Sequence, residues 1–441
     1  MAVLSMKPCL TARLRHALAP WRNAPALHVA FSGGLDSTVL LHLLANTEHL
    51  PPLSAVHVHH GLQAAADAWP SHCQSVCDSL GVPLRVMRVQ VQPGASLERA
   101  AREARYQALA EVVGAGEVLL TGQHRDDQAE TLLFRLLRGS GVRGLAAIPV
   151  QRPLAGGHLL RPLLDASRAE LEAYAHEHQL EWIEDPSNAD PRFSRNYLRH
   201  RVFPVLTERW PQAVSSLART AEHLSDAQGL LDELARMDLQ FADRPSPLPW
   251  LQLPSLDLAA LRKLSDARQR NALRHWLAPL TRLPDSDHWA SWYSLRDAKA
   301  DAQPLWRLAD GELHRCGERI WWLPAIWSEF SDATVSWPDP QNPLELPGNG
   351  LLSIIGEAPE GPLEVRYRQG GEIVEVPGRG RRDLKRLLNE SGVPGFVRGR
   401  LPLLYRGEQL LGVPSLIGHW AAPSRGWQLH WMPQTCDQGL S

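Results

Sequence analysis

The sequence predicts an α/β protein: an N-terminal domain on a parallel, Rossmann-like sheet, then a helical domain and a small α+β C-terminal domain. Over roughly the first 165 residues, short β-like runs alternate with helical stretches, as crossovers between parallel strands require. Residues 211–240 and 256–278 have helical periodicity without a strand signal. Beyond residue 350, short strands and turns surround one helix at 382–391.

The N-terminal pattern is a series of apolar strands separated by helices. The expected strands are short β-like runs bounded by turn residues, at 27–31, 53–59, 84–91, 117–122 and 159–164. The expected helices lie between them at 37–45, 67–80, 97–113 and 126–137. Ser167 and Glu170 form a capping-box pattern, so another helix should begin after Ser167.

Two proline-rich segments divide the rest of the chain. The first, 244–250, has too many prolines for a helix interior, and the second, 337–350, predicts an interdomain linker. We therefore expect three domains, at residues 1–212, 213–335 and 345–441.

Composition limits the class of protein. Hydrophobic residues make up 44% and charged residues 21% of 441 residues, as in a globular rather than a disordered chain. No apolar run approaches the ~18 residues of a membrane span, and the N-terminus lacks the apolar core of a secretory signal. Five cysteines point to a reducing compartment. We expect a cytoplasmic protein.

The most informative motif follows the first predicted strand, at Ser32-Gly-Gly-Leu-Asp-Ser37. Paired glycines let the backbone turn tightly, and the next helix offers free N–H groups and a positive dipole end to a phosphate. Asp36 suits a Mg²⁺ ion or a reacting group beside that anion. An ordinary strand-to-helix turn does not account for these residues together.

Other site motifs fail on spacing or position. No lysine follows a glycine, so there is no Walker A loop, and Gly139–Gly144 fits G-x-G-x-x-G but follows a helix, not a strand. The histidines at 57–60 and the residues His72, Cys73 and Cys77 lack zinc-site spacing, which favours structural histidines.

A second strand-to-helix junction carries acidic residues. Asp127 and Glu130 are three residues apart, so their carboxylates can share a helical face. Acidic residues also cap helices, which is the structural alternative. The position after a parallel strand, where such sheets bind ligands, favours a functional role.

The 32–37 loop resembles the pyrophosphate-binding loop of the N-type ATP pyrophosphatases, the PP-loop superfamily, whose domain is of the adenine nucleotide alpha hydrolase type. Within it, the chain resembles the tRNA(Ile)-lysidine synthase family nearly throughout and in order. The similar segments are 57–62, 98–106, 122–131, 135–141, 161–164, 182–188, 195–199, 270–277, 384–390, 393–394 and 402–404. The middle region is the least diagnostic.

The resemblance implies an ATP-dependent ligase that joins free L-lysine to the wobble cytidine of the isoleucine tRNA with a CAU anticodon. The cytidine is first adenylated with release of pyrophosphate, and the lysine amine then displaces AMP. The product, lysidine, switches the tRNA from methionine to isoleucine identity. Residues 1–212 would be catalytic, 213–335 would bind the tRNA substrate and 345–441 would bind tRNA.

The resemblance also assigns roles to residues. The amine of free lysine has a pKa of about 10.4, so it arrives protonated. Asp127 and Glu130 would hold this ammonium group and accept its proton. Arg195 and Arg199, with Arg192 close by, would hold the anionic intermediate or the tRNA, unless they form a solvated helix face. The expected ATP-binding residues are Ser32, Gly33, Gly34, Leu35, Asp36, Ser37 and His57, with Asp36 near Mg²⁺; the expected catalytic residues are Asp36, Asp127, Glu130 and Arg195.

The C-terminal region is basic although the whole chain has a net charge of −2. Residues 366–406 contain ten basic and four acidic side chains, a local charge of +6, which suits tRNA phosphates. The expected tRNA-binding residues are Arg199, Arg366, Arg368, Arg381, Arg382, Lys385, Arg386 and Arg398.

Two alternatives stay open on sequence alone. A sulfur-inserting tRNA enzyme typically uses paired cysteines, but Cys73 and Cys77 are separated by three residues, not two. A non-catalytic nucleotide sensor that binds tRNA would explain the loop and the basic region, but not Asp127 with Glu130. The oligomeric state is also open, with a homodimer among the expectations.

Overall fold

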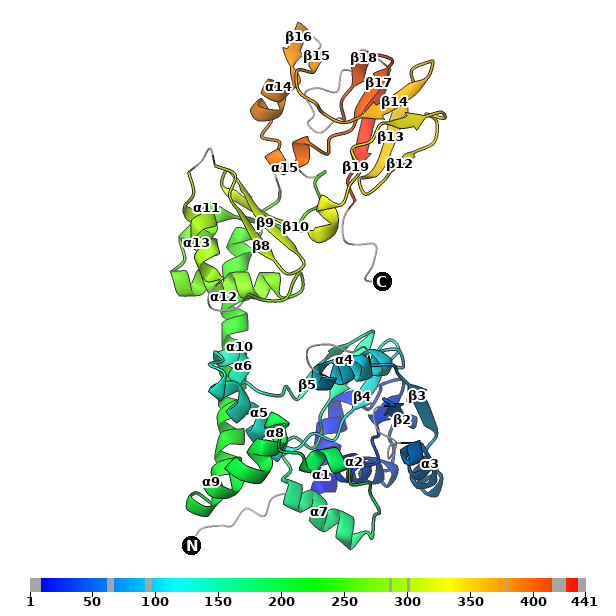
Figure 1. Ribbon diagram of the computed structural model, residues 1–441, viewed down its shortest axis with the longest axis vertical. Coiled ribbons are helices and arrows are strands. Elements are labelled where there is room, and N and C mark those ends of the chain that lie inside the picture. Colours follow the sequence, from blue (N-terminus) through cyan, green and yellow to red (C-terminus); the bar gives the residue numbers. More distant parts are fainter. Residues whose placement is uncertain are drawn as a thin grey trace. The chain divides into compact units, whose positions relative to one another are not determined.

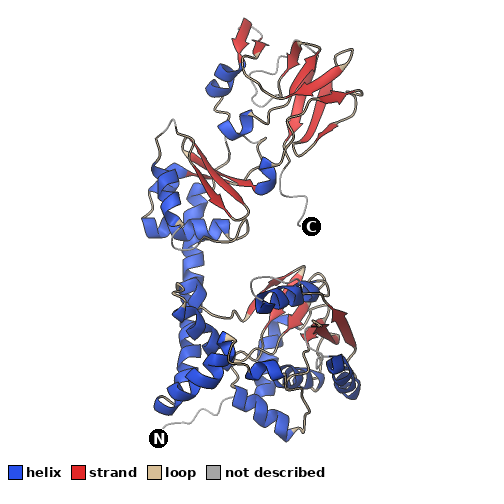
Figure 2. Ribbon diagram, viewed as in Figure 1, coloured by secondary structure: helices blue, strands red, loops and turns tan. Residues whose placement is uncertain are grey.

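The computed structural model describes residues 9–61, 67–91, 97–246, 248, 250–284, 288–299, 302–376, 380–414 and 426–434 (Figures 1 and 2). The chain divides into two compact units, 1–229 and 230–441. The helix α10 (Ala213–Ala242) contributes residues to both units. In the described part of the chain, no helix is long and apolar enough to cross a membrane.

The first unit is built on a six-stranded sheet with the order β3-β2-β1-β4-β6-β5. Five strands are parallel: β1 (Leu27–Ala30), β2 (Leu53–His59), β3 (Leu84–Arg88), β4 (Val118–Leu120) and β6 (Gly157–Leu160). The first four confirm the predicted runs, whereas β6 begins two residues before the run predicted at 159–164 and ends at Leu160. The edge strand β5 (Gln151–Leu154) is antiparallel and was not predicted. Its polar residues and Pro153 give no strand signal, and an edge position tolerates the proline.

Helices cover both faces of this sheet. Alternate strand residues point to opposite sides: Ala55 lies in the core with α1, α2, α3 and α7, whereas Val56 lies in the core with α4. The helix α2 is apolar nearly all round because it is buried in the first of these cores. The helices and turns of the unit are α1 (Leu10–Leu18), η1 (Ala19–Trp21), α2 (Leu35–Ala45), α3 (Trp69–Leu80), α4 (Leu97–Ala110), α5 (Arg125–Leu137), α6 (Val142–Leu145), α7 (Arg168–Glu177), η3 (Pro186–Ala189), α8 (Ser194–Tyr197), the π-helical turn η4 (Leu198–Val202) and α9 (Phe203–Arg209).

The predicted capping box at the start of α7 is confirmed. Ser167 accepts a hydrogen bond from the Glu170 backbone N–H, and the Glu170 carboxylate accepts from the Ser167 N–H at 2.7 Å. Arg13 of α1 also pairs with Glu170. Burial acts to raise the pKa of Glu170, but the bonds from Ser167 and Arg13 outweigh it and lower this pKa from 4.5 to about 2.

This cap gives a pH-dependent prediction. Glu170→Gln should lower the free energy of unfolding by about 1–3 kcal/mol at neutral pH, because it removes the charge that holds Ser167 and Arg13. The lowered pKa means that the wild-type advantage is present above pH 4.5 and disappears as the pH falls through about 2. Thermal unfolding between pH 7 and pH 2 measures this. Glu172→Gln is the control, because Glu172 makes only an exposed pair with Arg168.

After the end of α10, the second unit contains three short helices packed beside an antiparallel sheet. The helices are α11 (Leu258–Arg262), α12 (Asp266–Leu277) and α13 (Trp289–Asp297), and the sheet has the order β7-β10-β9-β8, formed by β7 (Ser255–Asp257), β10 (Arg319–Pro324), β9 (Gly311–Cys316) and β8 (Leu305–Leu308). The helical periodicity is confirmed, but the sheet was not predicted. It closes over buried tryptophans, among them Trp292, Trp306 and Trp322.

The predicted linker at 337–350 is wrong. This segment contains strands, and Trp337 is only 2% exposed because it lies in a core with side chains from both sides of the segment, such as Leu323 and Leu403. The Trp337 indole N–H donates to the carbonyls of Asp339 and Asn342 at 3.1 Å. The prolines therefore shape tight turns between strands of one packed region.

The C-terminal region consists of short strands around two small helices. The helix predicted at 382–391 is α14, whereas α15 was not predicted. One sheet has the order β11-β14-β17-β18, a second has the order β12-β13-β19, and β15 and β16 form a hairpin beside α14. The elements are η5 (Ala325–Ser328), β11 (Val335–Trp337), β12 (Leu344–Leu346), β13 (Gly350–Gly356), β14 (Leu363–Arg366), β15 (Ile373–Val376), β16 (Gly380–Asp383), α14 (Leu384–Glu390), α15 (Gly395–Arg398), β17 (Leu403–Arg406), β18 (Gln409–Gly412) and β19 (Trp427–Met432).

Candidate active site

A cavity of about 940 Å³ lies at the carboxyl ends of the parallel strands of the first unit. The chain runs from β1 through β2 to β3 on one side and places β4 on the other side of β1, so the strand order reverses between β1 and β4. Open α/β sheets bind ligands at such a reversal. The residues predicted for the site that line the cavity are Ser32, Gly34, Leu35, Asp36, Ser37, His57, Asp127, Arg195 and Arg199.

The 32–37 loop has the backbone geometry that its glycines suggest. Gly33 has a φ of +83°, and its carbonyl accepts a hydrogen bond from the Ile183 N–H at 2.8 Å. A Cβ at Gly33 would lie 2.7 Å from Ile183 Cδ1 and 3.1 Å from Cys73 Sγ. Both conformation and space therefore require glycine at this position.

The start of α2 leaves donors free for an anion. Its N-cap is Gly34, which has no side chain to cap the first turn. Ser32 Oγ and Ser37 Oγ lie 3.1 Å apart at the same turn. Unpaired N–H groups, the helix dipole and two hydroxyls together form a phosphate-binding cradle.

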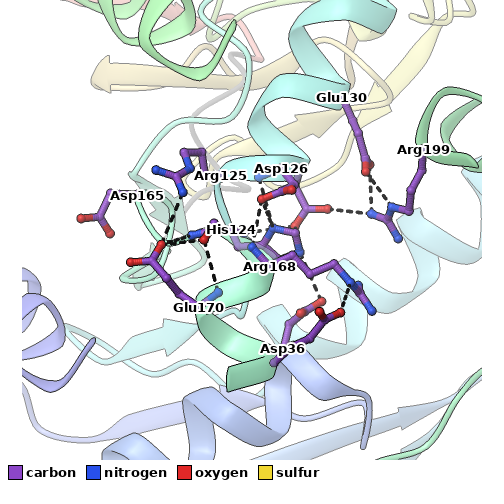
Figure 3. Close-up of polar contacts among 12 residues, drawn as sticks. Asp36, His124, Arg125, Asp126, Glu130, Asp165, Arg168, Glu170 and Arg199 are labelled. Atoms are coloured by element: carbon purple, nitrogen blue, oxygen red, sulfur yellow. Dashed lines mark hydrogen bonds and ion pairs between the residues drawn. The ribbon is translucent and has the colours of Figure 1, made fainter. Parts of the chain in front are cut away.

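A residue that the sequence did not single out, His124, connects the two junctions (Figure 3). It is fully buried at the N-cap of α5, and its Nε2 lies 3.5 Å from Asp36 Oδ2 and 3.6 Å from Asp127 Oδ2. Burial acts to lower the pKa of His124, but Asp126, Asp36 and Asp127 outweigh it and raise the pKa to about 10. The ring of His124 therefore connects these carboxylates, and its Nδ1 accepts a hydrogen bond from the Asp126 backbone N–H at 3.2 Å. In the sequence, the one signal for His124 is that it lies within the 122–131 segment. Its contacts with three carboxylates are seen only in the structure.

Gly122 allows β4 to approach α2. A Cβ at Gly122 would lie 2.8 Å from the Asp36 carbonyl oxygen and 3.1 Å from the Ser37 nitrogen. The two predicted junctions therefore meet backbone to backbone, which brings Asp36 and Asp127 to one site.

Asp127 and Glu130 differ in their access to the cavity. Asp127 lines the cavity, whereas Glu130 is only 3% exposed. Arg199 donates to Glu130 Oε1 at 2.6 Å and to Asp127 Oδ1 at 3.3 Å (Figure 3). Burial raises the pKa of Glu130 more than Arg199 lowers it. Glu130 is therefore connected to the cavity by Arg199, which lines it.

Three other residues predicted for the site, Arg199, Arg195 and His57, also line the cavity, and each has different hydrogen-bond partners. Arg199, predicted to contact tRNA, lines the cavity and forms ion pairs with both Asp127 and Glu130. Arg195, four residues earlier, donates to Thr131 Oγ1 at 3.4 Å and also lines the cavity. His57 donates from Nδ1 to the Phe31 carbonyl at 2.9 Å, and burial lowers its pKa, which favours a neutral ring.

The predicted tRNA-binding residues of the C-terminal region fall into two groups. Arg366, Arg368 and Arg386 form ion pairs with Glu364, Glu372 and Glu390 respectively, and Arg398 donates to Asn389 and to the Val393 carbonyl. The second group is exposed on β16 and α14 and has no ion pair with any residue that the structure describes; it comprises Arg381, Arg382 and Lys385.

The buried thiols do not suit sulfur transfer. Burial, with a smaller effect of Cys77, raises the pKa of Cys73 to about 12, and burial with Asp78 raises the pKa of Cys77 to about 11. Persulfide chemistry requires a thiolate, which these surroundings disfavour. No group of three metal-binding side chains occurs in the described ranges.

The fold and the loop define an ATP-binding protein of the PP-loop class, and comparison with known proteins agrees. A PP-loop domain model matches residues 6–206, a TilS substrate binding domain model matches 256–321, and a TilS substrate C-terminal domain model matches 363–431. The tRNA(Ile)-lysidine synthases of Pseudomonas fluorescens and Pseudomonas aeruginosa are each 63% identical, over 98% of this chain and 98–99% of theirs. That of Escherichia coli O157:H7 is 42% identical over 87% of this chain and 90% of its own. The chain belongs to the tRNA(Ile)-lysidine synthase family and is a ligase that uses ATP.

Proposed function

We propose that the 940 Å³ cavity carries both half-reactions of lysidine formation: adenylation of the wobble cytidine, then attack by lysine on the activated base. The observation that supports this is that groups suited to bind a phosphate and groups suited to bind an ammonium lie in the same cavity. A phosphate cradle at the start of α2 lies beside an acidic cluster at the start of α5, with His124 between Asp36 and Asp127.

The nucleotide side of the cavity is assigned to the 32–37 loop. Its free N–H groups and hydroxyls would hold the departing pyrophosphate. Asp36 Oδ1 is buried without a hydrogen-bond partner, as suits a ligand of Mg²⁺, an ion commonly held by one or two carboxylates and the substrate phosphates. When bound, Mg²⁺ would neutralise charge that develops on the phosphates.

The lysine side is assigned to Asp127, with Glu130 and Arg199 behind it. A lysine ammonium must lose a proton before it attacks, and of the two α5 carboxylates Asp127 and Glu130 it is Asp127 that lines the cavity. Arg199, now between Asp127 and Glu130, would turn toward the anionic adenylate when the ammonium arrives. The sparse cysteines support a cytoplasmic site of action.

The test of this function is direct. Purified protein is incubated with labelled L-lysine, ATP, Mg²⁺ and unmodified isoleucine tRNA with a CAU anticodon. We expect label in the RNA, with AMP and pyrophosphate released in equal amounts. ATP binding without any transfer of lysine would instead indicate a nucleotide sensor.

The three domains proposed from the sequence divide this work, and the matches at 6–206, 256–321 and 363–431 support the division. We assign the contribution of the C-terminal domain to exposed cations on β16 and α14, because Arg366, Arg368 and Arg386 already have carboxylate partners. These cations would bind tRNA phosphates, which makes binding sensitive to salt.

Charge reversal of Arg381 and Arg382 tests this assignment. We expect weaker tRNA binding and a salt slope reduced by roughly 0.7 to 0.9 for each phosphate that the protein no longer neutralises. Turnover at saturating tRNA should change much less than the tRNA concentration needed to reach it. Arg85 and Arg88, exposed on β3, provide the matched double reversal. An unchanged slope would mean that Arg381 and Arg382 do not contact tRNA.

A further inference from the structure

A second cavity, of about 530 Å³, adjoins the first. The two cavities share Arg102, Tyr106, Gln123 and Arg195 in their linings. The second extends from there toward the edge strand β5 and the start of the β5–β6 hairpin, and no role assigned above uses it.

Arginines dominate this second lining. Six of its residues are arginines: Arg99, Arg102, Arg135, Arg152, Arg161 and Arg195. The one carboxylate among the lining residues belongs to Glu103, which pairs with Arg99 at 2.7 Å. The other five arginines form no ion pair with any side chain that the structure describes. Cations in a structural role are normally paired, so this lining suits a polyanion.

The arginines are held in place by neutral groups. Arg135 donates to the carbonyls of Gly144 and Ala147 at 2.8 Å, and Arg161 donates to the Pro149 carbonyl and to Gln123. The guanidinium groups of Arg102 and Arg152 lie 4.9 and 5.0 Å from the centre of the Tyr106 ring. These contacts fix the positions of the cations without neutralising them.

These arginines also make the charged forms of their neighbours less favourable. Burial, and then the neighbouring charges of Arg195 and Arg102, lower the pKa of Arg135. Burial also lowers the pKa of Arg161. Tyr106 opposes this effect, and Arg152 and Arg102 lower the pKa further by smaller amounts. The repulsion between these charges lowers the stability of the folded protein. An anion bound among them would offset this repulsion.

We infer that the second cavity binds a backbone phosphate of the RNA next to the nucleotide that reacts in the first cavity. A base inside a polynucleotide cannot enter a site without its own phosphates, and the arginine-rich second cavity adjoins the first, with Arg102 and Arg195 in both linings. Guanidinium groups bind phosphate oxygens in a forked geometry. This inference rests on the proposed function and adds the site that positions the RNA strand.

The test is a double-mutant cycle between protein and RNA. Arg152→Gln is the main variant, because Arg152 lines the second cavity and not the first, and Arg102→Gln is a second variant at a residue that lines both cavities. Arg85→Gln is the surface control. The RNA is an anticodon stem–loop in which the phosphates on either side of the wobble cytidine are replaced, one at a time, by uncharged methylphosphonates.

We expect wild-type protein to lose roughly tenfold in affinity for one of the two substituted RNAs. Arg152→Gln should bind the natural RNA roughly tenfold more weakly and lose less than about twofold on that substitution. Equal losses in wild type and in both variants, when thermal unfolding shows them folded, would overturn the inference.

A separate arm distinguishes the source of the phosphate. If the second cavity held departing pyrophosphate instead, Arg152→Gln would weaken inhibition by added pyrophosphate and leave RNA affinity unchanged, and the inference would be wrong. Transfer of lysine by the wild-type protein to the natural stem–loop or full tRNA is measured alongside. That activity reports on the proposed function, so a failed cycle with intact transfer contradicts only the phosphate site.

Discussion

Asp36→Asn should reduce formation of the adenylated tRNA by about 10²- to 10³-fold while the protein remains folded. The asparagine keeps the size of the side chain but removes the charge that faces His124 at 3.5 Å and the free oxygen assigned to Mg²⁺. The half-reaction is measured as pyrophosphate released in the presence of tRNA and in the absence of lysine.

The control is Asp78→Asn, an exposed carboxylate on α3 in the same unit. Near-normal pyrophosphate release by Asp36→Asn would contradict the assignment of Asp36 to the metal and the phosphates. A titration of Mg²⁺ sharpens the result: the variant should need far more Mg²⁺ than wild type to reach its own maximal rate.

Glu130→Gln should have its largest effect on the second half-reaction. Glutamine cannot hold the Arg199 guanidinium as a carboxylate does at 2.6 Å, so Arg199 loses its place beside Asp127. We expect transfer of lysine to fall by about 10²-fold or more, and adenylation to fall by much less. Single-turnover measurements on adenylated tRNA, with lysine added last, separate the two steps.

An equal loss in both half-reactions would contradict this division and assign Glu130 to the nucleotide side. Glu111→Gln, an exposed acid after α4, controls for the change of charge alone. A partial recovery of lysine transfer in Glu130→Asp would support a charge requirement, because aspartate restores the carboxylate on a shorter side chain.

The local chemistry of the site could be predicted from the sequence because it depends on residues close together in the chain. Gly33, Gly34 and Asp36 lie in one turn. A strand-to-helix junction with paired glycines is well suited to bind a phosphate, because the backbone can turn tightly and the helix N-terminus offers free N–H groups. The parallel strands and the capping box at Ser167 and Glu170 likewise follow from local pattern.

Local pattern failed where tertiary packing determined the structure. The segment at 337–350 has the composition of a linker, yet Trp337 is buried in a core to which distant segments contribute. The sheet that contains β7 and the edge strand β5 also escaped prediction. Short strands gain most of their stability from partners that are remote in the sequence, so their own residues carry a weak signal.

The phosphate loop, Asp36, Asp127 and the basic C-terminal region could be recognised in the sequence as candidate functional groups. Their connections depend on folding. The close approach of Gly122 to Asp36 brings α2 and α5 together, His124 lies among three carboxylates, and Arg199 forms an ion pair with Glu130. These contacts cannot be read from local sequence because burial sets the charge and partners of an ionisable group, and burial depends on residues that the chain brings together only when it folds.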